Sequence, residues 1–393
     1  MGATGRRVVF LFFVVLADAS LGATGATELS PEGRLGRRLF FDETLSASGK
    51  LACASCHDPA NAYAAPRTAA VVMRGGAQLE QPGLRTVPSL RYLSGTPRFA
   101  RHVYRDSGSE REDLGPAGGF MLDGRADDLS EQALLPLLDP AEMGSSSIEE
   151  LATRLRNARY AWEFSQVFPP PVDARALVAQ AGAALERFEQ EDPSFHPYDS
   201  RFDRSLQGAE HLSAQELEGL RLFRDPEKGN CAACHTATTG PGGRAPDFTD
   251  RSYHALGVPR NPAIPANRDS RFFDLGLCGP RRTDLRGDQQ YCGYFKTPTL
   301  RNVARRRFFF HNGRFSSLQE VLQFYVARDI DARRWYPSIG GKLRKFDDLP
   351  PHYHGNVNTS DAPLNRRAGE SPALDEREIA ALIAFLRTLD DAS

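Results

Sequence analysis

The strongest constraint on this chain is a five-residue pattern that occurs twice. Cys-x-x-Cys-His stands at residues 53–57 and again at residues 231–235. It is the attachment sequence for a c-type haem, because two thiols must reach two vinyl groups of one porphyrin while the adjacent imidazole reaches the iron. The residues concerned are Cys53, Cys56, His57, Cys231, Cys234 and His235. We expect two covalently bound haem c groups, with His57 and His235 as ligands of the two irons.

The first residues read as an export signal. Arg6 and Arg7 precede an apolar run over 8–17, and small residues follow. A charged start, a short apolar run and a small-residue exit define a secretory signal peptide, which we place at residues 1–26. The run is too short for a spanning helix, although an uncleaved anchor is the alternative. Because bacteria attach haem c after export, we expect a periplasmic protein with no membrane span after cleavage.

Two cysteines remain outside the haem patterns, Cys278 and Cys292. In an oxidising compartment they can pair and staple the loop that leads into Thr297; two free thiols are the alternative. For the patterns themselves the alternatives are a redox dithiol and a zinc knuckle. A zinc site needs closely paired ligand sets, and two full copies in an exported chain are not a chance occurrence.

An internal repeat predicts two similar domains. Gly-x-x-Leu-Phe occurs at 36–40 and at 219–223, each time shortly before a haem pattern. We expect a mainly α fold of two cytochrome c-like haem domains with long irregular loops, over residues 27–205 and 206–393. A chain of 393 residues has room for two such domains. Its net charge of −1 gives no reason to expect nucleic acid as a partner.

Local patterns place the helices and loops. Helices are expected over 128–138, 147–168, 173–188 and 375–389. Two further helices should begin at capping boxes, Ser213 with Glu216 and Ser317 with Glu320. Residues 58–127 and 240–265 are rich in turn-forming residues and are expected to be irregular.

Longer stretches resemble one family, the bacterial dihaem cytochrome c peroxidases with their MauG branch. The matching segments are 35–42, 45–49, Asp123-Gly-Arg-Ala126, Asp139-Pro-Ala-Glu-Met143, Thr297-Pro-Thr-Leu-Arg-Asn302 and Phe310-His-Asn-Gly313. They cover nearly the whole mature chain in the family's order. The resemblance implies a high-spin N-terminal haem that meets hydrogen peroxide and is the site of peroxidase activity. It also implies a six-coordinate C-terminal haem and a calcium ion between the two.

The resemblance assigns an acid–base group to the first haem. Glu142 stands at the position of the family's distal glutamate, nineteen residues after Asp123, and Gln132 matches a residue that lines the same pocket. A carboxyl group in an apolar pocket has a raised pKa, which suits the transfer of a proton between peroxide oxygens. Without the family, Glu142 is a surface residue after Asp-Pro. No histidine lies between His57 and His102, so we expect an open first site that needs no reductive activation.

The second ligand of the second iron decides the branch. In the family a Met or a Tyr lies fourteen residues after the His of the Phe-His motif, and counting from His311 gives Tyr325. None of the four methionines lies beyond Met143. The resemblance therefore implies that Tyr325 binds the second iron, as in the MauG branch. The alternative is that Tyr325 is part of an apolar helical face with Leu318 and Leu322.

Three positions depart from the family. Leu122 replaces the Trp between the haems, and Gly229 replaces the surface Trp that MauG uses to reach its protein substrate. The calcium side-chain ligands would fall near Thr86 and Arg306, and a guanidinium cannot bind a cation. The calcium content and the sharing of charge between haems are therefore open at this point.

Three functions follow. The first is a periplasmic dihaem oxidase of the MauG kind, which uses hydrogen peroxide at the first haem and long-range electron transfer through the second to oxidise a partner protein. The second is an ordinary peroxidase that takes electrons from a small cytochrome c or cupredoxin. The third is a dihaem electron carrier without enzyme activity. We expect the first, an oxidoreductase.

Overall fold

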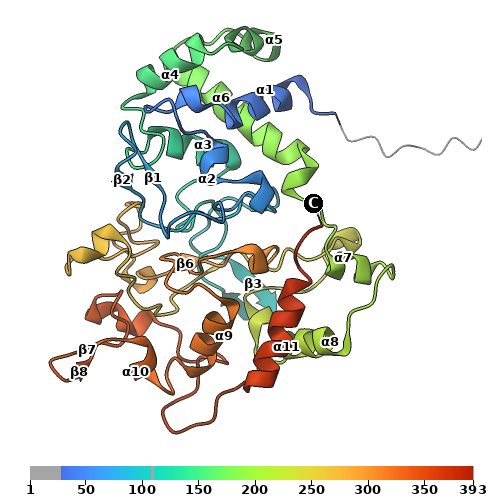
Figure 1. Ribbon diagram of the computed structural model, residues 1–393, viewed down its shortest axis with the longest axis vertical. Helices are drawn as coiled ribbons and strands as arrows, with labels where there is room; N and C mark the ends of the chain where they lie inside the picture. Colours follow the sequence, from blue (N-terminus) through green and yellow to red (C-terminus); the bar gives the residue numbers. More distant parts are fainter. Residues whose placement is uncertain (1–27, 108–109, 393) are drawn as a thin grey trace, which may run out of the picture.

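The computed structural model describes residues 28–107 and 110–392 and contains two large hydrophobic cores (Figure 1). One is built from residues between 35 and 195, in the upper half of the view. The other is built from residues between 202 and 389, in the lower half. The prediction of a mainly α fold with long irregular loops is confirmed. The predicted division at residue 205 stays a prediction; the first core ends at Phe195 and the second begins at Phe202.

The described α-helices are short and follow the two cores along the chain. The first core carries α1 (Pro31–Phe40), α2 (Cys53–Cys56), α3 (Leu129–Leu138), α4 (Ile148–Asn157), α5 (Phe164–Val167) and α6 (Ala174–Glu191). The second half carries α7 (Arg201–Leu206), α8 (Ala214–Arg224), α9 (Leu318–Ala327), α10 (Ala332–Trp335) and α11 (Glu376–Arg387). None of the helices in the described part of the chain is long and apolar enough to cross a membrane. The expected signal peptide, 1–26, lies outside the described residues.

Strands are few and form four antiparallel pairs among the described residues. The pairs are β1 (Arg74–Gly75) with β2 (Gln81–Pro82), β3 (Tyr104–Ser107) with β4 (Glu110–Asp113), β5 (Tyr253–His254) with β6 (Phe295–Lys296), and β7 (Ser338–Ile339) with β8 (Lys342–Leu343). The long segments between them are irregular, as the turn-forming composition of 58–127 and 240–265 predicts.

Side-chain caps explain where the longer helices begin. A Ser or Asp before each one accepts a hydrogen bond from a backbone N–H of the first turn, which would otherwise have no partner. These caps are Ser30, Asp128, Ser147, Asp173, Ser200, Ser213, Ser317 and Asp375. The predicted capping box at Ser213 is complete. The one at Ser317 is not, because the Glu320 carboxylate accepts the N–H of Ser316 instead.

The single helix predicted over 147–168 is wrong. Helix α4 ends at Asn157, and α5 begins only at Phe164 after a 3₁₀ turn. The backbone becomes extended at Ala158, and the next turns bring Tyr160 inward, where its hydroxyl donates to Asp42 over 2.6 Å. The contact between Tyr160 and Asp42 therefore interrupts the helix that the sequence pattern predicts.

The repeated Gly-x-x-Leu-Phe motif makes the same helix contact in both halves. Helix α1 packs against α6, and α8 packs against α11. A Cβ on Gly36 would overlap the Ala184 carbonyl and lie 2.8 Å from the Phe188 Cβ. A Cβ on Gly219 would overlap the Ala381 carbonyl and lie 2.8 Å from the Phe385 Cβ. Only glycine permits this approach, so each motif fixes the same kind of helix crossing in its own half.

The segment 97–126 belongs to the first half in sequence but contacts the second half. Ala117 forms a β-bridge with Ser252, and the Leu122 carbonyl accepts the N–H of Lys296 over 2.9 Å. Figure 1 shows β3 among segments of the second half. Further along, Cys278 and Cys292 form a disulfide that closes the loop before β6. These contacts hold the loops that surround the second haem attachment site.

Candidate haem centres

The first attachment motif forms a single helical turn. Cys53 and Cys56 are the two ends of α2, and His57 follows as its cap residue. The Nδ1 of His57 lies 3.1 Å from the Tyr63 carbonyl. A carbonyl only accepts, so Nδ1 carries the hydrogen and the Nε2 lone pair is left for a metal. Burial lowers the pKa of His57 to about 4, which keeps the ring neutral and able to bind.

The second attachment motif repeats this geometry. Cys231 begins a 3₁₀ turn, and the Nδ1 of His235 lies 3.0 Å from the Phe248 carbonyl. The same argument leaves the Nε2 of His235 for a metal. Burial again lowers the pKa of this histidine, so its ring is also neutral.

The cysteines match haem attachment better than a zinc knuckle. Burial raises the pKa of Cys53 and of Cys231 to about 12, so both thiols keep their protons. A zinc knuckle needs four ligands that lie together. Within the described ranges only Cys234, Asp250 and His254 form a group of three potential ligands, and Cys234 belongs to the haem motif.

A deep cavity beside the second motif has walls that fit a haem. Cys231, Cys234 and His235 line it, together with apolar side chains such as Val321 and Leu386. Arg306 also lines it, and burial alone lowers the pKa of this guanidinium to about 10. A buried cation beside an apolar slot suits the carboxylate of a haem propionate. The residues present therefore fit the group that the motif implies.

Tyr325 lies in the wall of the same cavity. It stands on α9, and its ring is 5.8 Å from that of Phe310. Burial raises the pKa of its hydroxyl, and the nearby Cys234 and Cys231 raise it further. Leu318 and Leu322 of the same helix face line this cavity as well. Tyr325 can therefore belong to the apolar face of α9 and also lie where a ligand of the second iron is expected.

Glu142 lies in the turn after α3. Its carbonyl accepts the N–H of Gly76 over 2.7 Å, which fixes the turn against the β1–β2 hairpin. Burial raises the pKa of the carboxyl, and the charge of Asp139 raises it further, whereas Arg281 and Arg125 act in the opposite direction. Glu142 in turn raises the pKa of Cys56. The glutamate therefore lies within electrostatic reach of the first haem motif.

Gln132 lies on α3 and is buried, with 7% of its surface exposed. Its Oε1 has no hydrogen-bond partner among the described residues. A buried amide oxygen without a partner is uncommon and indicates a polar ligand or a water at that place. This observation is compatible with the predicted pocket for peroxide, and the role of Gln132 stays a prediction.

The next histidine after His57 lies on the surface. His102 is exposed, and its Nδ1 lies 2.6 Å from the Asp113 carboxylate. This contact holds the His102 side chain at the base of the β3–β4 hairpin. The expectation of an open first site is therefore compatible with the described structure.

The two side chains at the family's calcium positions do not fit a calcium site. The hydroxyl of Thr86 donates to the Phe310 carbonyl over 2.9 Å, and Arg306 lines the haem cavity with a positive charge. Hard cations need several oxygen ligands, and a guanidinium offers none.

Sequence reasoning missed a buried charge network beside Leu122, which itself lines the second haem cavity. Arg85 donates to Asp123 over 2.7 Å and to both oxygens of Asp274 over 2.7 and 2.8 Å. Arg282 donates to the carbonyls of Asp123 and Gly124. The network joins three segments that are distant in sequence, near residues 85, 123 and 274–282. Only Asp123, in the Asp-Gly-Arg motif, carried a signal for it.

Two neutral imidazoles each follow a Cys-x-x-Cys pair, and one of them lines a cavity with largely apolar walls. This arrangement defines a dihaem c-type cytochrome. A family description, di-haem cytochrome c peroxidase, matches residues 31–211. The chain is 31% identical over 367 residues to the methylamine utilization protein MauG of Paracoccus denitrificans, which covers 91% of this chain and 88% of that protein. The chain therefore belongs to the di-haem cytochrome c peroxidase family.

Two further relatives agree. Over 324 residues, the chain is 28% identical to the cytochrome c551 peroxidase of Nitrosomonas europaea, with 78% of this chain and 79% of that protein covered. The crystal structure of the diheme peroxidase BthA from Burkholderia thailandensis superposes with a TM-score of 0.82 and 39% identity, over 93% of this chain and 87% of that one. The protein is thus an oxidoreductase, a dihaem peroxidase with two haem c groups.

Proposed function

We propose that the protein is a periplasmic peroxidase of the MauG kind, which passes oxidising equivalents from hydrogen peroxide to a partner protein. The observation that carries the proposal is Tyr325 in the wall of the cavity that contains His235. A hard anionic phenolate favours oxidised iron, whereas a methionine ligand raises the reduction potential and favours electron acceptance from a small cytochrome. The chain has no methionine beyond Met143 to take that place.

The haems, when bound, supply the electron transfer that reduces peroxide. The protein supplies proton transfer and position. The Glu142 carboxylate accepts a proton from one peroxide oxygen and returns it to the other, so that the departing oxygen leaves as water. Its raised pKa suits both directions of this transfer. His57 and His235 hold the two groups through neutral rings that the Tyr63 and Phe248 carbonyls orient.

The ligand assignment is tested by electron paramagnetic resonance of the diferric protein. We expect Tyr325→Phe to lose the low-spin signal of the second haem. Tyr336→Phe is the matched control, because Tyr336 is also buried in the second core and its hydroxyl bonds only the Gly257 carbonyl. An unchanged low-spin signal in Tyr325→Phe would remove the basis of the proposal.

A second candidate is a peroxidase that is reduced by a small cytochrome c or cupredoxin. Leu122 favours it, because this aliphatic side chain lines the haem cavity and cannot carry a charge between the haems. Stoichiometric peroxide added to the diferric protein separates the two functions. Loss of both haem signals together supports the MauG kind, whereas loss of the high-spin signal alone, with rapid turnover of reduced cytochrome c, supports the second candidate.

A further inference from the structure

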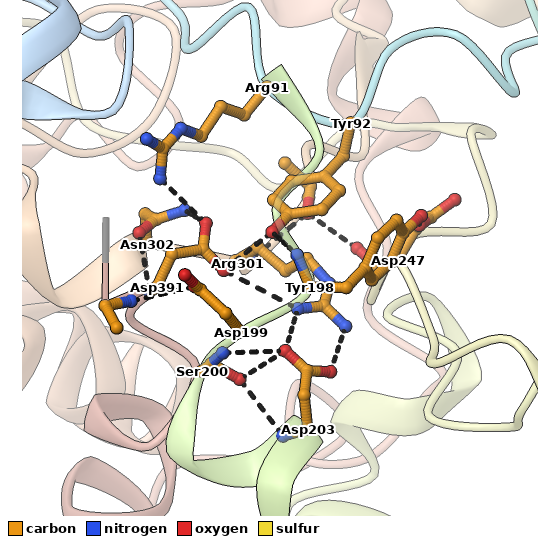
Figure 2. Close-up of polar contacts among 12 residues, drawn as sticks. Arg91, Tyr92, Tyr198, Asp199, Ser200, Asp203, Asp247, Arg301, Asn302 and Asp391 are labelled. Carbon is orange, nitrogen blue, oxygen red and sulfur yellow. Dashed lines mark hydrogen bonds and ion pairs between the residues drawn. The ribbon is translucent and has the colours of Figure 1, made fainter. Parts of the chain in front are cut away.

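A buried polar cluster connects the two halves of the molecule (Figure 2). We call it the clamp and define it as Arg91, Tyr92, Tyr198, Asp203, Asp247, Arg301, Asn302 and Asp391. Its members come from the first core, the connecting segment near 198–203, the second core and residue 391. Arg301 is 1% exposed, and its guanidinium donates to both oxygens of Asp203 over 2.8 Å. All members of the clamp are buried except Tyr198, which is half-buried.

Two tyrosines lie in the middle of the clamp. The rings of Tyr92 and Tyr198 are 4.8 Å apart and meet edge to face. The guanidinium of Arg301 lies 4.7 Å from the first ring and 4.6 Å from the second. The N–H of Tyr198 also donates to the Tyr92 hydroxyl over 3.2 Å. The two rings are in direct contact, so that an electron can pass between them.

Each tyrosine hydroxyl donates to a carboxylate. Tyr92 donates to Asp391 over 2.6 Å, and Tyr198 donates to Asp247 over 2.5 Å. Arg91 donates to the other oxygen of Asp391 over 2.9 Å, so this carboxylate is held between a guanidinium and the phenol. A phenol that loses an electron becomes a strong acid, and each ring here has a base in hydrogen-bond contact that can take its proton.

Arg251 gives Asp247 the same support, because its guanidinium donates to the second oxygen of that carboxylate over 2.6 Å. Asn302 donates to Asp391 over 2.5 Å and completes the set around the other carboxylate. Both bases are therefore oriented toward a phenol before any reaction takes place. Proton movement requires no rearrangement of side chains.

The clamp also leads to the histidines of both haem motifs. The Tyr63 carbonyl that accepts from His57 accepts the N–H of Leu90 as well, and the next residues are Arg91 and Tyr92. On the other side, the Phe248 carbonyl accepts from His235, and Phe248 follows directly after Asp247. Each tyrosine of the pair is thus joined to one haem motif by a short run of backbone and hydrogen bonds.

We propose that Tyr92 and Tyr198 are a redox-active pair that takes up oxidising equivalents from the haems. One electron leaves a tyrosine for a peroxide-oxidised haem, the phenolic O–H bond breaks, and the proton forms a new O–H bond on Asp391 or Asp247. The products are a neutral tyrosyl radical and a neutral carboxylic acid. The oxidant is supplied by the peroxidase reaction, so the inference rests on the proposed function.

Other buried tyrosines lack one part of this arrangement. The hydroxyl of Tyr253 donates to the Gly118 carbonyl over 2.6 Å, and a carbonyl is a poor proton acceptor compared with a carboxylate. Tyr160 donates to Asp42, but it belongs to the first core alone. The pair in the clamp has both a carboxylate base and a connection to both haem motifs. Electrons can therefore leave the haems through this pair, which is connected to the two histidines, whereas the aliphatic side chain of Leu122 cannot carry them.

The experiment uses the full-length protein with both haems attached. Stoichiometric hydrogen peroxide is added without an electron donor, and samples frozen after set times are examined by electron paramagnetic resonance. We expect a tyrosyl radical in the native protein and its loss in the double variant Tyr92→Phe/Tyr198→Phe. Tyr253→Phe is the matched control and should keep the signal. Unchanged diferric haem signals show that each variant has folded.

A further variant tests the proton acceptor while keeping both rings. Asp247→Asn preserves a hydrogen bond to Tyr198 but takes no proton, so the share of the radical on Tyr198 should be lost in the variant Tyr92→Phe/Asp247→Asn. A tyrosyl signal that persists in Tyr92→Phe/Tyr198→Phe overturns the inference alone. So does a change in the haem absorption bands with no tyrosyl signal in the native protein. If peroxide changes no spectrum at all, the proposed function fails and the inference with it.

Discussion

The two haem motifs share one frame and differ in the groups around it. In each half a glycine on one helix packs against an Ala carbonyl and a Phe side chain of another. Gly36 of α1 packs against α6, and Gly219 of α8 packs against α11. In each half the histidine donates to a backbone carbonyl. We call the helix crossing and the histidine–carbonyl hydrogen bond together the shared frame. It occurs in both halves because each half binds a haem. What distinguishes the halves lies outside the repeat.

The difference is a matter of which ionisable groups are buried near each motif. The first motif has Glu142 within electrostatic reach, and the second has Tyr325 in the wall of its cavity. The equivalent helix crossings also align the next residue in each half. Phe188 and Phe385 occupy equivalent places, so Glu189 corresponds to Leu386, which lines the second haem cavity. The halves therefore differ at one position on the repeated helix pair, Glu189 against Leu386, and at Glu142 and Tyr325, which lie outside it.

The largest effect is expected at Glu142. We predict that Glu142→Gln slows the reaction with peroxide by about 10²–10⁴-fold, the usual contribution of a general acid–base group. In the native protein the rate should fall as the pH drops through the raised pKa of Glu142, because only the carboxylate accepts a proton. Rapid-mixing absorption measurements check both points. Exposed Glu149→Gln is the control, and equal rates in the two variants would contradict the assignment.

Glu189 should make the stability of the first half depend on pH. Its carboxyl is buried, and burial raises its pKa from 4.5 to about 8. The unfolded chain loses this proton first, so the free energy of unfolding falls as the pH rises from 4.5 to about 8. Glu189→Gln should therefore stabilise the holoprotein by about 2–4 kcal/mol at pH 8 and leave it unchanged at pH 4.

Chemical denaturation at the two pH values measures this difference. Glu149→Gln again serves as the control, because its carboxyl is on the surface. A stabilisation of the same size at both pH values would show that the carboxyl of Glu189 does not titrate in this range.

The shared frame can be broken in either half. Gly36→Ala and Gly219→Ala each force a methyl group into a helix crossing that has no room for it. We expect each to cost about 1–3 kcal/mol of unfolding free energy, which is typical of an overpacked core. Thermal unfolding followed by circular dichroism measures it. Gly355→Ala, where nothing lies within 4 Å of the new methyl group, should have little effect. Very different costs at Gly36 and Gly219 would refute the equivalence of the two crossings.

The smallest effect is expected at the two helix caps that begin the repeated helices. Ser30 caps α1 by accepting the N–H of Gly33, and Ser213 caps α8 by accepting the N–H of Glu216. Replacement of either by Ala should cost about 1 kcal/mol, the usual value for a lost cap. Urea denaturation of the two variants checks it. A cost in one half only would show that the first turns of α1 and α8 are held by different contacts.

The sequence predicted most where the signal was local. The Cys-x-x-Cys-His patterns, the Gly-x-x-Leu-Phe repeat and the caps at Ser213 and Ser317 each lie within a few residues. The helical pattern of 147–168 failed because the inward turn at Tyr160 depends on Asp42, which is far away in the sequence. The charges of the clamp could not be predicted for the same reason. Nothing near Arg91 indicates that its partner is Asp391, a separation of 300 residues.

The pairing of Arg91 with Asp391 also sets an order of events during synthesis. When Arg91 is added to the growing chain, its carboxylate partner is still 300 residues away in the sequence. The first haem motif is translated long before that point, whereas Arg91 and the Tyr92 hydroxyl still lack their partner, Asp391. The Arg91–Asp391 contact can therefore form only after the last helix, α11, has been translated.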